Sequence, residues 1–210
     1  MHHPDLKRML SIVGRSTAGP VREAIAQLWS ERPDLIDEEA LETLTTDPSV
    51  AVRRAAVAAW GGAKQFDRLA AMIADPDPGV RVDIARAFLD APDTAALEAL
   101  YLDPDEMVRA ALFVTRLLRG EWSEPPAAFG ISRPAAATAV RQAVAVETLR
   151  DIARDEQDPE RRLRAALALA VLLDEAAYTV MRSDPVWAVR DRVGRMLAGW
   201  RESPDARRPA

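Results

Sequence analysis

The chain has 210 residues, of which 49% are hydrophobic and 29% are charged, and its formal net charge is −5. This composition supplies a hydrophobic core and differs from that of a disordered chain. The absence of cysteine excludes disulfides, thiolate nucleophiles and cysteine-based metal sites. No run of residues approaches the roughly 18 apolar positions of a membrane span, and no signal-like segment precedes the first expected helix. We therefore expect a soluble, cytoplasmic protein. Only two of the 28 basic residues, Lys7 and Lys64, are lysines, a bias typical of GC-rich bacterial genes.

Two kinds of helical segment alternate along the chain. Short amphipathic segments are expected at about 5–13, 37–46, 64–74, 93–102 and 174–182. Between them lie segments in which apolar residues recur at helical spacing, as in Val52, Ala55, Ala56, Ala59 and Trp60. These second segments are apolar nearly all round, so we expect each to be flanked by other helices on several sides. Pairing the two kinds predicts about six antiparallel helical hairpins.

A short motif marks most of the second segments. It consists of Asp-Pro, then an aliphatic residue five positions after the Asp and an Arg six positions after it. Asp is a favourable N-cap and Pro suits the first helical position, so the motif predicts a helix start. The first three copies are 28 residues apart and the last two are 26 apart, and such a period predicts stacked repeats. The copies begin at Asp47, Asp75, Asp103, Asp158 and Asp184. An earlier degenerate copy has Val21 and Arg22, with Ser16 in place of the Asp.

These repeats resemble the HEAT-repeat family, specifically its short bacterial HEAT-like type, over about residues 4–200. The resemblance implies an all-α fold, a right-handed α-solenoid that forms one continuous array. Residues 201–210 lack periodicity and are expected to be a disordered tail. The resemblance also implies that the Asp and Arg of the motif bond to one another along the stack as a structural ladder. Its arginines would be Arg53, Arg81, Arg109, Arg164 and Arg190.

The pattern breaks between the third and fourth copies. Residues 120–134 contain three prolines and two glycines and cannot be helical throughout. We interpret them as an inserted loop that leads into an over-long helix at about 135–156. Trp122 and Phe129 in this loop are candidates for contact with a partner, because large apolar side chains are costly to leave in water. The alternative is that they fold back onto the helices and cover a groove.

The second segments also carry arginines that the ladder does not use. These arginines are candidates for binding an acidic surface, with solvated side chains as the alternative. They are Arg54, Arg86, Arg116, Arg119 and Arg195. Trp187 is expected to be exposed and is a further candidate, whereas Trp29 and Trp60 occupy core positions.

The sequence gives little support to catalysis. The only histidines are His2 and His3, and no Gly-rich phosphate loop, nucleophile elbow or metal-ligand spacing is present. We therefore expect no cofactor, no catalytic residue and no metal site. The preferred hypothesis is a monomeric, non-catalytic scaffold or adaptor that docks a protein partner along its stacked helices. A regulatory domain for a neighbouring gene product is a competing interpretation.

Two other classes of HEAT-like protein stay open as alternatives. The HEAT-like DNA glycosylases share this architecture and use Trp, Asp and Arg on a strongly basic concave surface. The net charge of −5 opposes strong nonspecific DNA binding, so nucleic acid is not the expected partner. The HEAT-like bilin lyases resemble the chain in repeat type only.

Overall fold

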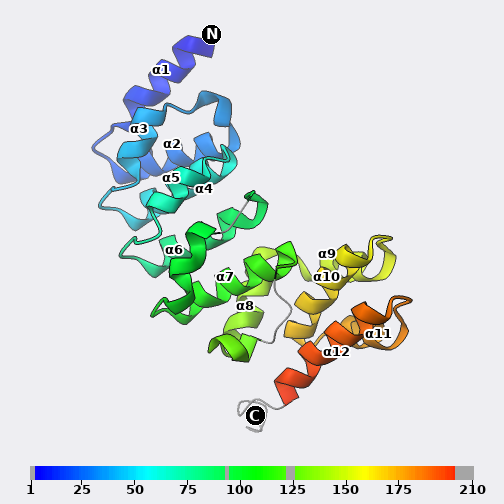
Figure 1. Ribbon diagram of the computed structural model, residues 1–210. Helices are drawn as coiled ribbons and strands as arrows, with labels where there is room; N and C mark the ends of the chain where they lie inside the picture. Colours follow the sequence, from blue (N-terminus) through cyan, green and yellow to red (C-terminus); the bar gives the residue numbers. More distant parts are fainter. Residues whose placement is uncertain (1–2, 93–94, 122–125, 202–210) are drawn as a thin grey trace. The chain divides into compact units, whose positions relative to one another are not determined.

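The computed structural model describes residues 3–92, 95–121 and 126–201, and all regular secondary structure in these ranges is helical (Figure 1). The all-α prediction is confirmed for this part of the chain. Its residues form two compact units, Met1–Ala99 and Leu100–Ala210. The single array from residue 4 to 200 stays a prediction, and the expected tail lies outside the described residues apart from Arg201. In the described ranges, no helix has both the length and the apolar character needed to cross a membrane.

The first unit alternates short helices with buried ones. The helices of this unit are α1 (His3–Gly14), α2 (Gly19–Glu31), η1 (Pro33–Leu35), α3 (Glu38–Leu44), α4 (Val50–Gly62), α5 (Phe66–Ala71), α6 (Pro78–Ala87) and η2 (Phe88–Asp90). The longer helices α2, α4 and α6 pack against one another in sequence order. Trp29 and Trp60 are fully buried in α2 and α4, so their predicted core positions are confirmed.

The second unit continues the alternation after η3 (Ala95–Leu102), a 3₁₀ helix whose first residues belong to the first unit. Its further helices are α7 (Glu106–Arg119), η4 (Pro126–Phe129), α8 (Arg133–Ala143), α9 (Val146–Asp155), α10 (Pro159–Leu172), α11 (Glu175–Ser183) and α12 (Trp187–Arg201). Helix α10 is apolar nearly all round. It is buried over most of its length, because α7, α8, α9, α11 and α12 all contact it.

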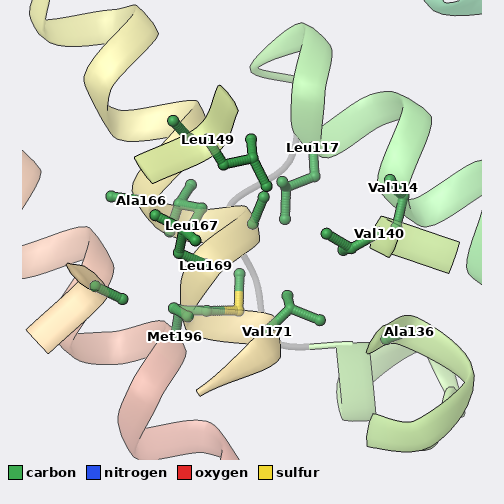
Figure 2. Close-up of a cluster of buried hydrophobic side chains, with 14 of the residues drawn as sticks. Val114, Leu117, Ala136, Val140, Leu149, Ala166, Leu167, Leu169, Val171 and Met196 are labelled. Atoms are coloured by element: carbon green, nitrogen blue, oxygen red, sulfur yellow. The ribbon is translucent and has the colours of Figure 1, made fainter. Parts of the chain in front are cut away.

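The core of the second unit is made largely of small and branched aliphatic side chains. Figure 2 shows side chains of α7, α8, α9, α10 and α12 gathered around the middle of α10. Many are alanines, which permits close approach of the helices. The larger labelled residues of this core are Val114, Leu117, Val140, Leu149, Leu167, Leu169, Val171 and Met196.

The structure corrects the assignment of the helix caps. In the second and third copies the N-cap is two residues after the motif Asp, because Asp77 and Asp105 accept backbone N–H groups from the first turns of α6 and α7. Asp75 and Asp103 instead accept the backbone N–H of those cap residues at 2.9 Å. The side chain of the motif Asp therefore forms a turn just before the helix. The N-cap residue two positions later then starts the helix.

The predicted ladder is confirmed for Arg53 and Asp75. The guanidinium of Arg53 donates to both carboxylate oxygens of Asp75 in the next repeat, at 2.7 and 3.0 Å. Its third nitrogen donates to the carbonyl of Asp47, six residues earlier, at 2.8 Å. Arg22 of the degenerate first copy bonds both oxygens of Asp47 in the same way. Arg22 and Arg53 thus each join their own turn to the turn of the following repeat.

In the fourth copy the ladder arginine is Arg162, and the prediction of Arg164 is wrong. Arg162 donates to both carboxylate oxygens of Asp184, at 2.8 and 3.2 Å, and to the carbonyl of Glu156. Glu156 stands in the motif Asp position, whereas Asp158 caps α10 by accepting the N–H of Glu160. The Asp-Pro pair therefore belongs two residues later in this copy, and the corrected spacing from Glu156 to Asp184 is again 28 residues.

A copy without the motif lies between α7 and α10. Helices α4, α6, α7 and α12 all begin three residues after a motif Asp, and α8 begins three residues after Gly130. The carbonyl of Gly130 accepts a hydrogen bond from Arg109 at 3.3 Å, in the place where a ladder carboxylate would stand. Ser132 caps α8 by accepting the N–H of Ala135. Gly130 is therefore the motif position of a degenerate repeat.

The predicted long helix at 135–156 is also wrong. The structure has α8 and α9 there, separated by Val144 and Ala145 in extended conformation. The predicted loop at 120–134 contains η4, and residues 122–125 lie outside the described part of the chain. This segment therefore supplies the short first element of the degenerate repeat, with α8 as its second helix.

Candidate partner-binding site

Two of the candidate arginines lie together on the second helices of the first unit. Arg54 on α4 donates to both carboxylate oxygens of Asp83 on α6, at 2.6 and 3.3 Å. Arg86, one turn further along α6, has its Nη1 3.5 Å from the same carboxylate. Asp83 breaks the apolar pattern of α6 and lies beside an open pocket. One carboxylate thus serves two guanidinium groups.

Burial distinguishes the two arginines. The side chain of Arg54 is 51% exposed, and that of Arg86 is 26% exposed. Burial lowers the pKa of the Arg86 guanidinium from its usual value, and the nearby positive charge of Arg54 lowers it further, while Asp83 acts in the opposite direction. The pKa of Arg54 is raised, first by its hydrogen bonds to Asp83. Arg86 therefore has a charge that is poorly solvated for a surface arginine.

These side chains surround an open pocket of about 390 Å³ between α4 and α6. Its apolar lining includes Val57, Ala58, Gly61, Ala87 and Leu89. The rim is charged, because Asp90 joins the two arginines and Asp83. Small residues keep the floor open, and a pocket of this form can take an apolar side chain while the arginines bind a neighbouring acidic group. We call it the α4–α6 pocket.

Arg116 and Arg119 also lie together, at the C-terminal end of α7. Arg119 donates to Glu121 at 2.5 Å, and the Nε of Arg116 lies 3.9 Å from the other oxygen of that carboxylate. The Arg116 guanidinium also lies over the ring of Tyr101, 4.8 Å from its centroid, in a cation–π contact. Both arginines are more buried than expected, with side chains 11% and 15% exposed.

Sequence reasoning missed a third arginine at this place. Arg164 on α10 is not part of the ladder. It lies against Gly120, and a Cβ added to Gly120 would be 2.7 Å from the Nε of Arg164. Gly120 ends α7 with a φ of +80°, a conformation that favours glycine. The buried Nε of Arg164 makes no hydrogen bond. The sequence motif assigned Arg164 to the ladder. Its position at the end of α7 could be found only from the packing of α10 against α7.

The remaining candidates are dispersed. Trp187 is 68% exposed at the first position of α12, as expected. Arg195 on the same helix is exposed and pairs with Asp191 at 3.1 Å. Phe129 packs against the ring of Phe113, with centroids 5.9 Å apart, which favours the interpretation that it covers the core. Trp122 lies outside the described residues.

Within the described ranges, no group of three or more His, Cys, Asp or Glu side chains is arranged to hold a metal ion.

Comparisons with known proteins identify no family. No family model matches the chain, and no curated protein matches it. Among the solved structures that the chain resembles is the crystal structure of an engineered protein, which aligns with 94% of this chain and 96% of its own length. Its sequence identity to this chain is 17% and the TM-score is 0.43.

Proposed function

We propose that this chain is a non-catalytic scaffold or adaptor that binds a protein partner with an acidic surface, and that the α4–α6 pocket is one docking point. The observation that carries the proposal is the pairing of Arg54 and Arg86 with a single carboxylate above an apolar floor. Apolar anchoring combined with arginine contacts is typical of protein interfaces, in which arginine is enriched. Trp187, exposed on α12, offers a second point of contact of the same kind.

The proposed architecture is a right-handed α-solenoid of the HEAT-like type, built of antiparallel helical hairpins. In the described residues, seven helices begin three residues after a motif position, which supports seven hairpins in place of about six. They are α2, α4, α6, α7, α8, α10 and α12. The proposed setting is the cytoplasm of a bacterium, with the protein acting as a monomer.

The test is affinity purification from lysate of the native host, with and without nuclease, using three forms of the protein. These are the wild type, the double variant Arg54→Ala/Arg86→Ala, and the charge-matched control Arg154→Ala/Arg161→Ala, which removes two exposed arginines of the second unit. The proposal predicts a nuclease-insensitive protein that the wild type and the control retain near stoichiometry and the double variant loses. Nucleic acid as the main co-purifying species would support the DNA glycosylase-like alternative instead.

A further inference from the structure

Arg190 on α12 differs from the ladder arginines Arg53 and Arg162 in what its guanidinium binds. In those two, Nε and Nη2 bind both oxygens of a carboxylate in the next turn, Asp75 or Asp184, while Nη1 donates to a carbonyl of the arginine's own turn. The Nη1 of Arg190 likewise donates to the carbonyl of Asp184, six residues earlier. Within the part of the chain that the structure describes, no carboxylate binds its Nε or Nη2. Arg190 is therefore held in the ladder position with one guanidinium edge available.

This edge of Arg190 is accessible to a ligand. The residue is only partly buried, and neither Nε nor Nη2 is among the fully buried nitrogens. Arg190 lies in the first turn of α12, about 16 Å along the helix axis from Arg201 at its other end. The residues around it on α11 and α12 are thus described on both sides.

The charge of Arg190 also differs from that of a filled ladder position. Arg53 has one motif carboxylate near it in its own turn and binds a second one in the next turn. Arg190 lies near Asp184 of its own turn, but both oxygens of that carboxylate are bound by Arg162. Among the described residues, Arg190 is therefore one carboxylate short of the arrangement around Arg53. A carboxylate is the group whose two oxygens match its free edge.

An exposed aromatic side chain lies beside Arg190. Trp187 is 68% exposed and stands three residues earlier on α12, and residues three apart are neighbours on a helix face. Trp187 is the first residue of α12, as Glu106 is of α7, and each stands three residues after a motif Asp. Glu106 accepts the backbone N–H of Ser132, the cap of the following repeat, at 2.6 Å. Trp187 thus occupies a position that contacts a following repeat in the case of α7.

We propose that Arg190 and Trp187 form a docking site for an acidic turn of another protein, in which one Asp or Glu carboxylate takes the place of the next ladder carboxylate. The free guanidinium edge binds both carboxylate oxygens, as in the filled positions, and the indole packs on an apolar neighbour in the turn. The site continues an interface between turns that the fold already contains, as in the Arg162–Asp184 pair. The inference rests on the proposed function for the source of the turn, a protein partner with an acidic surface.

Nuclear magnetic resonance with a defined probe tests the site directly. The probe is a peptide with blocked ends that copies residues 44–50, Leu-Thr-Thr-Asp-Pro-Ser-Val. It has one carboxylate, that of Asp47, which binds a ladder arginine in the intact protein. The control probe is the same peptide with Asp47→Asn. The reporters are the side-chain N–H signals of Arg190 and Trp187 in the full chain.

The protein variants are Arg190→Gln and Arg190→Lys, in which the indole N–H of Trp187 reports binding. Lysine keeps the charge but does not present two N–H groups in a fixed fork. The matched control is Arg182→Gln. Arg182 is an exposed arginine of α11 whose Nε donates to the carbonyl of Tyr178, and it forms no ion pair within the described residues. Thermal unfolding of each variant verifies the fold, and the two peptides compare binding on the unchanged protein.

The proposal predicts that the Asp peptide shifts both reporter signals in a saturable manner. Affinity should be about tenfold or more weaker for the Asn peptide and for Arg190→Gln, the loss expected for a hydrogen-bonded charge pair, and also weaker for Arg190→Lys. Arg182→Gln should bind as the wild type does. No saturable shift, equal affinity for the two peptides, unchanged affinity in Arg190→Lys, or an equal loss in Arg182→Gln would overturn the proposal.

Two further results, both measured without peptide, would identify a different occupant and overturn the proposal. A change of the Arg190 signal with protein concentration would indicate a second copy of the chain. A change of that signal in the variant Glu202→Gln/Asp205→Asn would indicate the chain's own carboxylates. The α4–α6 pocket lies in the other unit and is not probed by these peptides, so failure here leaves the proposed function standing.

Discussion

Two arginines on one helix, two positions apart, have different roles because they point to different neighbours. Arg162 is buried and forms bidentate hydrogen bonds to Asp184, whose side chain is only 3% exposed. Arg164 lies against the end of α7 with an unpaired buried Nε. Removing one partner of a buried ion pair leaves an uncompensated charge, which is far more costly than the loss of a surface arginine.

We therefore expect Arg162→Gln to lower the free energy of unfolding by about 3 kcal/mol, since it leaves Asp184 buried without its partner. We expect Arg164→Gln to change it by less than about 1 kcal/mol. Urea denaturation of the two variants and the wild type at pH 7 measures both. A larger loss for Arg164→Gln than for Arg162→Gln would show that the ladder runs through the originally predicted residue.

The ladder also predicts the pH dependence of stability. The pKa of Asp47 is lowered, first by its hydrogen bonds to Arg22. Burial alone would raise the pKa of Asp184, but hydrogen bonds from Arg162 and Val186 together with nearby positive charge outweigh it and lower the pKa. A carboxyl with a lowered pKa in the folded state contributes stability that is present above its unfolded pKa, about 3.9, and is lost as the pH falls through the folded pKa.

The contribution of these carboxyls to the free energy of unfolding should therefore vary little above about pH 5 and fall steadily below about pH 4. The ladder arginines Arg53 and Arg162 have raised pKa values, so their contribution would be lost only at extreme alkaline pH. Denaturation series from pH 7 to pH 2.5 measure the slope, and Asp184→Asn should make it shallower. An equally steep acid slope in that variant would contradict the role of Asp184.

At the level of the element, the sequence predicted each of the buried helices that follow an Asp-Pro motif, because apolar spacing acts locally, but it placed the N-caps of α6 and α7 two residues too early. It did not separate α8 from α9, since neither Val144 nor Ala145, which are extended in the structure, is a helix breaker. The Arg54–Arg86 pair could be proposed from the charge pattern. That Asp83 joins them, and that Arg164 lies against Gly120 at the end of α7, depends on how the helices pack.

The close approach of α2 and α4 gives an element-scale prediction. A Cβ at Gly62, the last residue of α4, would lie 2.7 Å from the carbonyl oxygen of Ser30 on α2. Backbone cannot move away as easily as a side-chain end, so Gly62→Ala should destabilise the fold by about 1–3 kcal/mol. Gly194→Ala on α12 is the control, because its nearest neighbour would be 3.6 Å away. It should be neutral or stabilising by up to about 1 kcal/mol through helix propensity.

Thermal or urea unfolding of the two glycine variants separates these effects. A Gly62→Ala variant as stable as Gly194→Ala would mean that α2 and α4 can move apart without lowering the free energy of unfolding.

At the scale of the whole molecule, each unit uses its buried charges for structure and keeps other arginines at its surface. Ladder pairs such as Arg53–Asp75 and Arg162–Asp184 are buried and bidentate, which fixes one turn against the next. Four of the candidate arginines lie in pairs, Arg54 and Arg86 at the α4–α6 pocket and Arg116 and Arg119 at the end of α7. Composition and spacing could indicate a binding role, but the identity of a partner is not encoded in a repeat pattern.

The measurement that tests the proposed function most directly is the affinity of the captured partner for the wild type, Arg54→Ala/Arg86→Ala and the control Arg154→Ala/Arg161→Ala at several salt concentrations. We expect the double variant to bind about tenfold or more weakly and with a smaller salt dependence, since it loses two arginine contacts at a partly buried site. The control should retain wild-type affinity, and all three proteins should unfold at similar urea concentrations. Equal affinity of the wild type and the double variant would contradict the assignment of the α4–α6 pocket as a docking point.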